Sequence, residues 1–332
     1  MSTSAPRVSV AMITHNHQRF IAQALDSVLM QEANFPFEIV IGEDHSTDGT
    51  RQIIEAYQRQ HPDTIRLLLR DRNIGSGPNL IKTFEACRGE YIAFLEGDDY
   101  WTDPHKLQIG VDFLDAYPEY TMCFHRYAIC DDQSDELTVS EPMGEDRTYT
   151  IEDVLIGSGW RMSLDGLVHL NTAIFRAEVL LPIPAWFRAL PHRDKAIFVM
   201  SAIRGKIAKV DREVSVYRVH DGGKWSGASP AARIQIRVEF CEVLRAGLDP
   251  GHRRQIHMTY VYHVAAHEYR KIGDRANARR MTNRALASYP RDPSIPINML
   301  ISLWLRLNLP VVHSAIARAK RLLLAPFSRR RV

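Results

Sequence analysis

The most constraining feature of this sequence is the regular alternation of short apolar runs and helix-like segments over its first hundred residues. Four runs are rich in apolar and β-branched residues: VSVAMI, FEIVIGED, IRLLLRD and EYIAFLEGDD. The segments between them, such as RFIAQALDSVLMQ, carry apolar residues at helical spacing. Strands that are apolar throughout and alternate with helices predict a mostly parallel α/β sheet that is covered on both faces.

Polar residues follow three of the predicted strands directly. Thr14 to Asn16 come after the first strand, Asp44 after the second, and Asp98 and Asp99 after the fourth. Parallel sheets bind ligands at the carboxyl ends of their strands. We therefore expect these three clusters to line one crevice.

The stretch FLEGDDYW places Glu96, Asp98 and Asp99 close together at a strand end. Crowded carboxylates repel one another unless a cation lies between them. An oxygen-rich site of this kind suits Mg²⁺ or Mn²⁺, with further positions left for phosphate oxygens and water. An isolated Asp-Asp pair is more typical of a solvated turn, but the convergence of three polar clusters favours the metal interpretation.

Composition excludes several classes of protein. With 45% hydrophobic and 24% charged residues, the chain has the composition of a soluble globular protein. The net charge is only +3 and the basic residues gather at the end, so no nucleic-acid partner is expected. The four cysteines form no CxxC pair and the first residues do not resemble a leader, which favours a reducing, cytoplasmic location.

The second half of the chain changes character near residue 230. Mixed strands and helices resume with HLNTAIFR and AIFVMSAIRGKIAKV, and the pattern is helical after YRVHDGGKWSGASPAA. We predict domains at residues 1–229 and 230–332, the second an α-helical appendage. The run from Ile297 to Val312 is too short and interrupted to span a bilayer. Followed by a basic end, it fits either peripheral membrane contact or a core-packed helix, and the two interpretations remain open.

Four segments together resemble the inverting glycosyltransferases of family 2: VSVAMITHNHQRFIAQALDSVLMQ, FEIVIGEDHSTDGT, NIGSGPN and GEYIAFLEGDDYW. The resemblance runs from about Val8 to Trp225. It implies the GT-A fold, a Rossmann-like, mostly parallel sheet flanked by helices. It also implies transfer from a nucleotide-diphosphate sugar to a saccharide or lipid-linked acceptor. The GDDYW motif resembles a branch that acts on cell-surface and O-antigen saccharides.

The same resemblance implies roles for individual residues. His15, Glu43 and Glu96 depart from the common tyrosine and aspartates of the family, and the two glutamates are expected to support rather than bind directly. The metal would be held by Asp98 or Asp99, and the general base would be Asp194, with Asp165 in reserve. The residues that the resemblance implies in substrate binding are Thr14, His15, Asn16, Asp44, Asn73, Asn79 and Asp98. The glycine-rich segment YRVHDGGKWSG adds Arg218 and His220, which can bind the diphosphate because a guanidinium group pairs with phosphate oxygens. Trp225, beside Lys224, is expected on a loop of this segment that covers the donor.

Two other functions are compatible with a sheet of this type. A sugar-phosphate nucleotidylyltransferase would need a glycine-rich basic loop near the start, and THNHQRF contains no glycine. A catalytically inactive carbohydrate-binding or scaffold protein on the same fold stays open, since only turnover separates it from an enzyme. The expected location is the cytoplasm, and it is the inner face of the cell membrane if the C-terminal region docks there.

Overall fold

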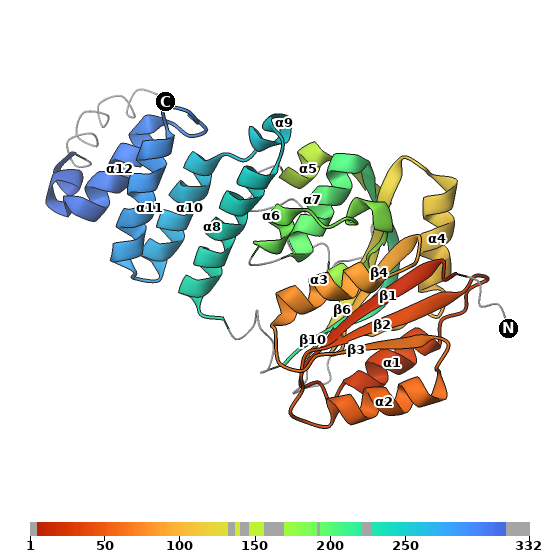
Figure 1. The fold of residues 1–332 in the computed structure, drawn as a ribbon. Coiled ribbons are helices and arrows are strands. Elements are labelled where there is room, and N and C mark those ends of the chain that lie inside the picture. The colour runs from red at the N-terminus through yellow and green to blue at the C-terminus, as the bar shows by residue number, and fades with distance from the viewer. Residues whose placement is uncertain are drawn as a thin grey trace, which may run out of the picture. The chain divides into compact units, whose positions relative to one another are not determined.

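The computed structural model describes residues 5–131, 137–139, 146–155, 169–190, 193–220 and 228–316. The described residues up to 220 belong to one compact unit and residues 228–316 to a second (Figure 1). Each unit has its own elements and is described separately.

The centre of the first unit is a sheet with the strand order β3-β2-β1-β4-β9-β6-β10-β5. Its four parallel strands are those expected from the apolar runs: β1 (Val8–Thr14), β2 (Phe37–Glu43), β3 (Ile65–Leu69) and β4 (Tyr91–Glu96). Val8 pairs with both Phe37 and Tyr91, so the three central strands run in step. Their carboxyl ends therefore finish at the same edge of the sheet.

Helices cover both faces of this sheet, as predicted (Figure 1). One core includes Val10 and Met12 of β1 together with apolar residues of α1 (Ile21–Leu29), α2 (Thr50–Gln60) and α4 (Lys106–Ala116). On the other face, Phe84 of α3 (Ser76–Ala86) contacts Phe94 of β4 and Phe175. Alternate residues of the buried strands thus supply two apolar layers, which explains why these strands are mostly apolar rather than alternating with polar residues.

The later elements extend the sheet with mixed pairing. β9 (Ile174–Arg176) lies antiparallel between β4 and β6 (Tyr120–Asp131), and β10 (Lys206–Val219) is parallel to β6. The short β5 (Tyr100–Trp101) pairs antiparallel with β10. The remaining elements are β7 (Leu137–Val139), β8 (Arg147–Tyr149), α5 (Ile151–Leu155), α6 (Ala185–Arg188) and α7 (Asp194–Arg204). Pairing of β5 with β10 joins the chain after β4 to the last strand of the unit.

The second unit is helical, as predicted. It contains α8 (Pro230–Gly247), α9 (Pro250–Arg253), α10 (Met258–Lys271), α11 (Arg275–Ser288) and α12 (Ile297–Asn308). Ser229 caps α8 by accepting a hydrogen bond from the amide of Ala232, and Pro230 occupies the first turn, where no amide donor is needed. Among the described residues, no helix has both the length and the apolar character that a bilayer-spanning segment requires.

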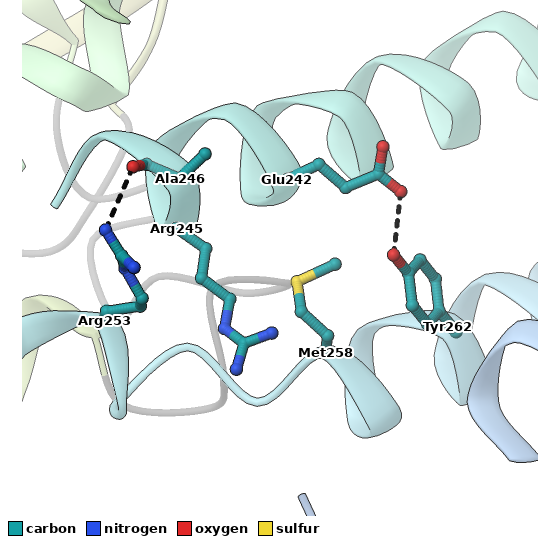
Figure 2. A pocket seen from close by; sticks show the side chains of 6 residues that line it. All are labelled: Glu242, Arg245, Ala246, Arg253, Met258 and Tyr262. Atoms are coloured by element: carbon teal, nitrogen blue, oxygen red, sulfur yellow. Dashed lines mark hydrogen bonds between the residues drawn. The ribbon is translucent and has the colours of Figure 1, made fainter. Parts of the chain in front are cut away.

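A shallow pocket of about 390 Å³ lies between α8, α9 and α10 of this unit (Figure 2). Polar contacts cross its rim: the Tyr262 hydroxyl donates to Glu242 over 3.0 Å, and Arg253 Nη2 donates to the carbonyl of Ala246 over 3.2 Å. These contacts join the helices on which the pocket is built.

Candidate functional site

The polar residues that follow β1, β2 and β4 meet at one edge of the sheet, as the sequence predicts. The Asp44 amide donates to the carbonyl of Thr14 over 3.0 Å, and the Gly97 amide donates to the carbonyl of Ile13 over 3.0 Å. The ladders between these strands thus continue into the polar loops. The sheet itself brings the three clusters together.

The first two loops are joined through Asn16. Its side-chain Oδ1 accepts a hydrogen bond from the backbone amide of Thr47 over 2.8 Å, and its backbone amide donates to Ser46 Oγ over 3.0 Å. Asn16 and His45 both adopt left-handed backbone conformations, at φ 57° and 59°, which asparagine tolerates better than most residues. The structure therefore gives Asn16 a clear part in shaping the crevice.

Asp44 is almost fully buried at 2% exposure, and its Oδ1 accepts a hydrogen bond from the Ile74 amide over 2.8 Å. Arg70 lies close enough for the Asp44 charge to raise its pKa, against a larger lowering by burial. Nη2 of Arg70 is buried and has no hydrogen-bond partner among the described residues. Sequence reasoning missed Arg70, whose position beside the predicted aspartate depends on the packing of β3 against β2.

Asn79 and Asn73 have different surroundings. Asn79 is 1% exposed; its amide donates to the carbonyl of Gly42 over 2.7 Å, and its Oδ1 accepts from Arg70 Nε over 3.0 Å. Asn73 is exposed, with its amide nitrogen 3.1 Å from Nε2 of His15. Asn79 thus holds Arg70 in place, whereas Asn73 and His15 lie together at the surface.

Asp99 is almost fully enclosed, at 1% exposure. Its Oδ1 accepts from the Arg218 amide and its Oδ2 from Asn171 Nδ2, both over 2.9 Å. Burial, and then the charge of Asp98, raise the pKa of Asp99 well above its ordinary value, and these two donors oppose the shift. A positive charge bound here would relieve the same electrostatic cost.

Asn171 connects Asp99 to the aromatic residues of the GDDYW motif. The Trp101 indole donates to the Asn171 carbonyl over 2.9 Å, and Ser215 Oγ donates to Asn171 Oδ1 over 3.2 Å. Trp101 and Ser215 are themselves paired across β5 and β10. The tryptophan after the acid pair therefore helps to orient Asp99. Sequence reasoning missed Asn171, and its only signal was a polar residue within the apolar stretch HLNTAIFR.

Asp98 faces two histidines. Its Oδ2 lies 3.0 Å from His220 Nε2 and 3.6 Å from His17 Nε2. Burial raises the pKa of Asp98, but the hydrogen bond from His220 and the charges on both imidazoles outweigh it, so the pKa lies below its ordinary value. A Cβ on Gly97 would lie 2.7 Å from Thr14 Oγ1 and 3.0 Å from His17 Nδ1, which explains the glycine in the motif.

Arg218 joins the two aspartates. Besides the amide bond to Asp99, its Nε donates to the carbonyl of Asp98 over 2.9 Å and its Nη2 donates to Gln23 Oε1 over 2.7 Å. The side chain is mostly buried, with its guanidinium over the rings of Phe20 and Tyr100. Arg218 is therefore positioned to hold the acid pair in place.

Glu96, Asp99 and His169 could hold a metal ion, because their ligand atoms lie within 4.8 Å of one another. Carboxylate and imidazole groups suit Mn²⁺ and other first-row cations. Asp99 was a predicted ligand and Glu96 a predicted supporting residue, whereas His169 was missed. Asp98 is not one of the three, since its Oδ2 faces the histidines.

Asp194, the predicted base, is the first residue of α7 and is exposed. The helix begins after Arg193, and no side chain caps it. Burial lowers the pKa of His169, and the charge of Asp194 acts in the opposite direction. Asp165, Lys224 and Trp225 lie outside the described residues.

Comparison with known proteins identifies the family of the chain. Residues 9–169 match the model of glycosyl transferase family 2. A Mycobacterium tuberculosis protein is 32% identical over 290 residues, covering 86% of this chain and 81% of its own. An uncharacterized glycosyltransferase of Nostoc is 30% identical over 233 residues, covering 69% and 70%.

Solved structures share the fold. TarS residues 1–349 of S. aureus with UDP has a TM-score of 0.57 at 17% identity, covering 90% of both chains. The mannosyltransferase PcManGT from Pyrobaculum calidifontis, with GDP-Man and Mn²⁺, has a TM-score of 0.55 at 20% identity, covering 97% of this chain and 88% of its own. The fold is the expected GT-A fold, and the chain belongs to glycosyltransferase family 2.

Proposed function

We propose that this glycosyltransferase is metal-dependent and inverting, and that it moves a sugar from a nucleotide-diphosphate sugar to a saccharide or lipid-linked acceptor. The observation that carries the proposal is the grouping of Glu96, Asp99 and His169, whose ligand atoms lie within 4.8 Å of one another. Asp194 adds an exposed carboxylate at the start of α7. A cation site and a carboxylate that can accept a proton are the two groups that an inverting displacement needs.

The nucleoside part of the donor would lie over the loops after β1 and β2. Asp44 and the buried, unpartnered Nη2 of Arg70 offer an acceptor and a donor for the edge of a base. His15 offers an imidazole on which a base can stack, and Thr14 and Asn16 shape the floor. Donors of this class are supported by the structures of TarS with UDP-GlcNAc and of PcManGT with GDP-Man.

Mn²⁺ or Mg²⁺ would be held by Asp99 with Glu96 and His169, and Asp98 would contact the ribose or the metal from the side of His220. When bound, the ion neutralises negative charge on the departing diphosphate. Arg218 and Asn171 fix the acid pair by the hydrogen bonds described above. His220 holds Asp98 and faces the same crevice, and Trp225 would cover the donor.

Asp194 would act as the general base. Inversion requires a single displacement, in which the acceptor hydroxyl loses its proton as the nucleoside diphosphate leaves from the opposite face of the sugar. An exposed carboxylate in the first turn of α7 can accept that proton. Asp194 then carries the proton at one of its carboxylate oxygens.

The acceptor class rests on the GDDYW motif and favours a role in cell-surface polysaccharide synthesis, at the inner face of the cell membrane. The alternative is a binding or scaffold protein that retains the fold without turnover. Incubation with UDP-, GDP-, CMP- and dTDP-sugars and Mn²⁺, followed by detection of released nucleotide, separates the two. Release from one donor supports the proposal, and its absence from every donor and acceptor tested contradicts it.

A further inference from the structure

Helix α12 carries apolar residues both where it packs against its neighbour and where it is exposed to solvent. Leu300, Leu303 and Leu307 are buried and α12 lies against α11. Arg279 of α11 fixes the end of the helix by donating from Nη2 to the carbonyl of Leu307 over 2.8 Å. Ile301, one residue after a buried leucine, is 47% exposed. A helix that packs only on its neighbours would place polar residues there.

Exposed apolar side chains are concentrated in and after this helix. Seven of the twelve exposed large hydrophobics in the described residues belong to the stretch 297–316. We call these seven the α12 surface: Ile297, Met299, Ile301, Leu309, Val311, Val312 and Ile316. Single exposed apolar residues are ordinary, but a concentration of this kind marks an interaction surface.

Acidic and basic residues are distributed unevenly between the part of the chain before residue 293 and the part after it. None of the 39 acidic residues lies after Asp292, whereas seven of the 42 basic residues do, which leaves 35 basic and 39 acidic residues before it. The seven are Arg306, Arg318, Lys320, Arg321, Arg329, Arg330 and Arg331, of which all but Arg306 lie outside the described residues. In the sequence, the positive charge therefore lies within and directly after the stretch that carries the exposed apolar residues.

We propose that the α12 surface and the basic residues after it dock on an anionic lipid membrane. This rests on the proposed function, in which a lipid-linked acceptor makes such docking useful. Apolar side chains beside Lys and Arg suit the boundary between acyl chains and anionic headgroups. Each basic residue near such a surface strengthens binding about fivefold. A second copy of the chain is a poorer occupant, because it would bring the same sign of charge to the contact.

The test is flotation of the full chain with vesicles that contain phosphatidylglycerol, compared with vesicles of phosphatidylcholine alone. We expect flotation with the anionic vesicles and much less with the neutral ones or in high salt. Ile301→Glu should weaken binding about tenfold or more. Its matched control is Ile272→Glu, since Ile272 is 43% exposed at the end of α10 in the same unit, and this variant should bind as the wild type does.

A combined Arg329→Ser, Arg330→Ser and Arg331→Ser variant should lose about a hundredfold in binding to anionic vesicles. The proposal is overturned if the wild type does not float with anionic vesicles, or if the two isoleucine variants lose binding equally. A dimer that dissociates on Ile301→Glu while flotation persists would assign the surface to a second copy. The melting shift caused by the donor, measured on the same samples, tests the catalytic proposal independently.

Discussion

Replacing Asn171 with alanine tests whether the enclosed aspartate is positioned by the network that begins at Trp101. Asn171 is 0% exposed, and its side chain donates to Asp99 Oδ2 and accepts from Ser215 Oγ. Its carbonyl, which accepts from the Trp101 indole, is part of the backbone and survives the change. Asn171→Ala therefore removes these two side-chain contacts and a longer one, from Nδ2 to the Val216 carbonyl over 3.5 Å. It leaves Asp99 with the Arg218 amide as its remaining close donor.

The magnitude follows from the type of each bond. A hydrogen bond to a charged group contributes about 1.5 to 3 kcal/mol and a neutral one about 1 kcal/mol. We therefore expect a loss of about 3 kcal/mol in the free energy of unfolding, which lowers the melting temperature of a unit of this size by about 6 to 12 °C. If Asp99 binds the ion, loss of a supporting hydrogen bond should weaken metal-dependent donor affinity by about tenfold to a hundredfold.

The assay is calorimetric titration of the best donor in Mn²⁺ and in EDTA, for the wild type and two variants. The control is Thr121→Val, which removes a buried hydroxyl that donates to the Ser201 carbonyl over 2.8 Å. Thr121 lies near the start of β6, where Tyr120 pairs with Lys206, while Arg218 pairs with Cys130 near the other end. This variant should lose about 1 to 2 kcal/mol in stability and keep the wild-type difference between Mn²⁺ and EDTA.

An Asn171→Ala protein that is destabilised but keeps the full Mn²⁺-dependent increment in donor affinity would refute the reasoning. An equal loss of that increment in Thr121→Val would refute it as well, since the effect would then follow stability rather than the position of Asp99.

Two other variants probe separate parts of the account. Asp194→Asn should abolish transfer while donor binding by calorimetry survives; near-normal turnover would reject Asp194 as the base. Burial lowers the pKa of Lys106 to about 7 from 10.5, with its Nζ 4.2 Å from the Trp101 ring centroid and without a hydrogen-bond partner in the described part of the chain. Between about pH 7 and pH 10.5, Lys106 binds a proton in the unfolded chain but not in the folded one. The free energy of unfolding therefore rises with pH over this range. Lys106→Met should remove that rise and stabilise the protein by about 4 kcal/mol near pH 7, measured by urea unfolding at several pH values; an unchanged slope contradicts it.

The sheet and the edge that carries the site were predictable because their signals are local. Each parallel strand is a continuous apolar run, and the residue after its last apolar position must lie at the carboxyl edge. Asp44 and Asp99 were found in this way. The helical C-terminal unit followed from the same periodicity.

The partners of these aspartates were not predictable, because they come from distant parts of the chain. Asn171 lies in the short helix Leu170–Thr172, 72 positions along the chain from Asp99. His169 and His17 carry no local signal beyond being histidines. The resemblance assigns Asn79 to the nucleoside, but it does not predict the side chain's own contacts. In the structure, its amide group contacts the Gly42 carbonyl and Arg70 Nε.

The most direct test of the central claim is the melting temperature of the protein with a panel of UDP-, GDP-, CMP- and dTDP-sugars, in Mn²⁺ and in EDTA, for the wild type and Asp99→Asn. A donor that binds only the folded state raises the melting temperature. The account predicts a shift with at least one donor in Mn²⁺, and loss of that shift in EDTA and in Asp99→Asn. An equal shift in EDTA and in the variant would contradict a metal-assisted donor site at the end of β4.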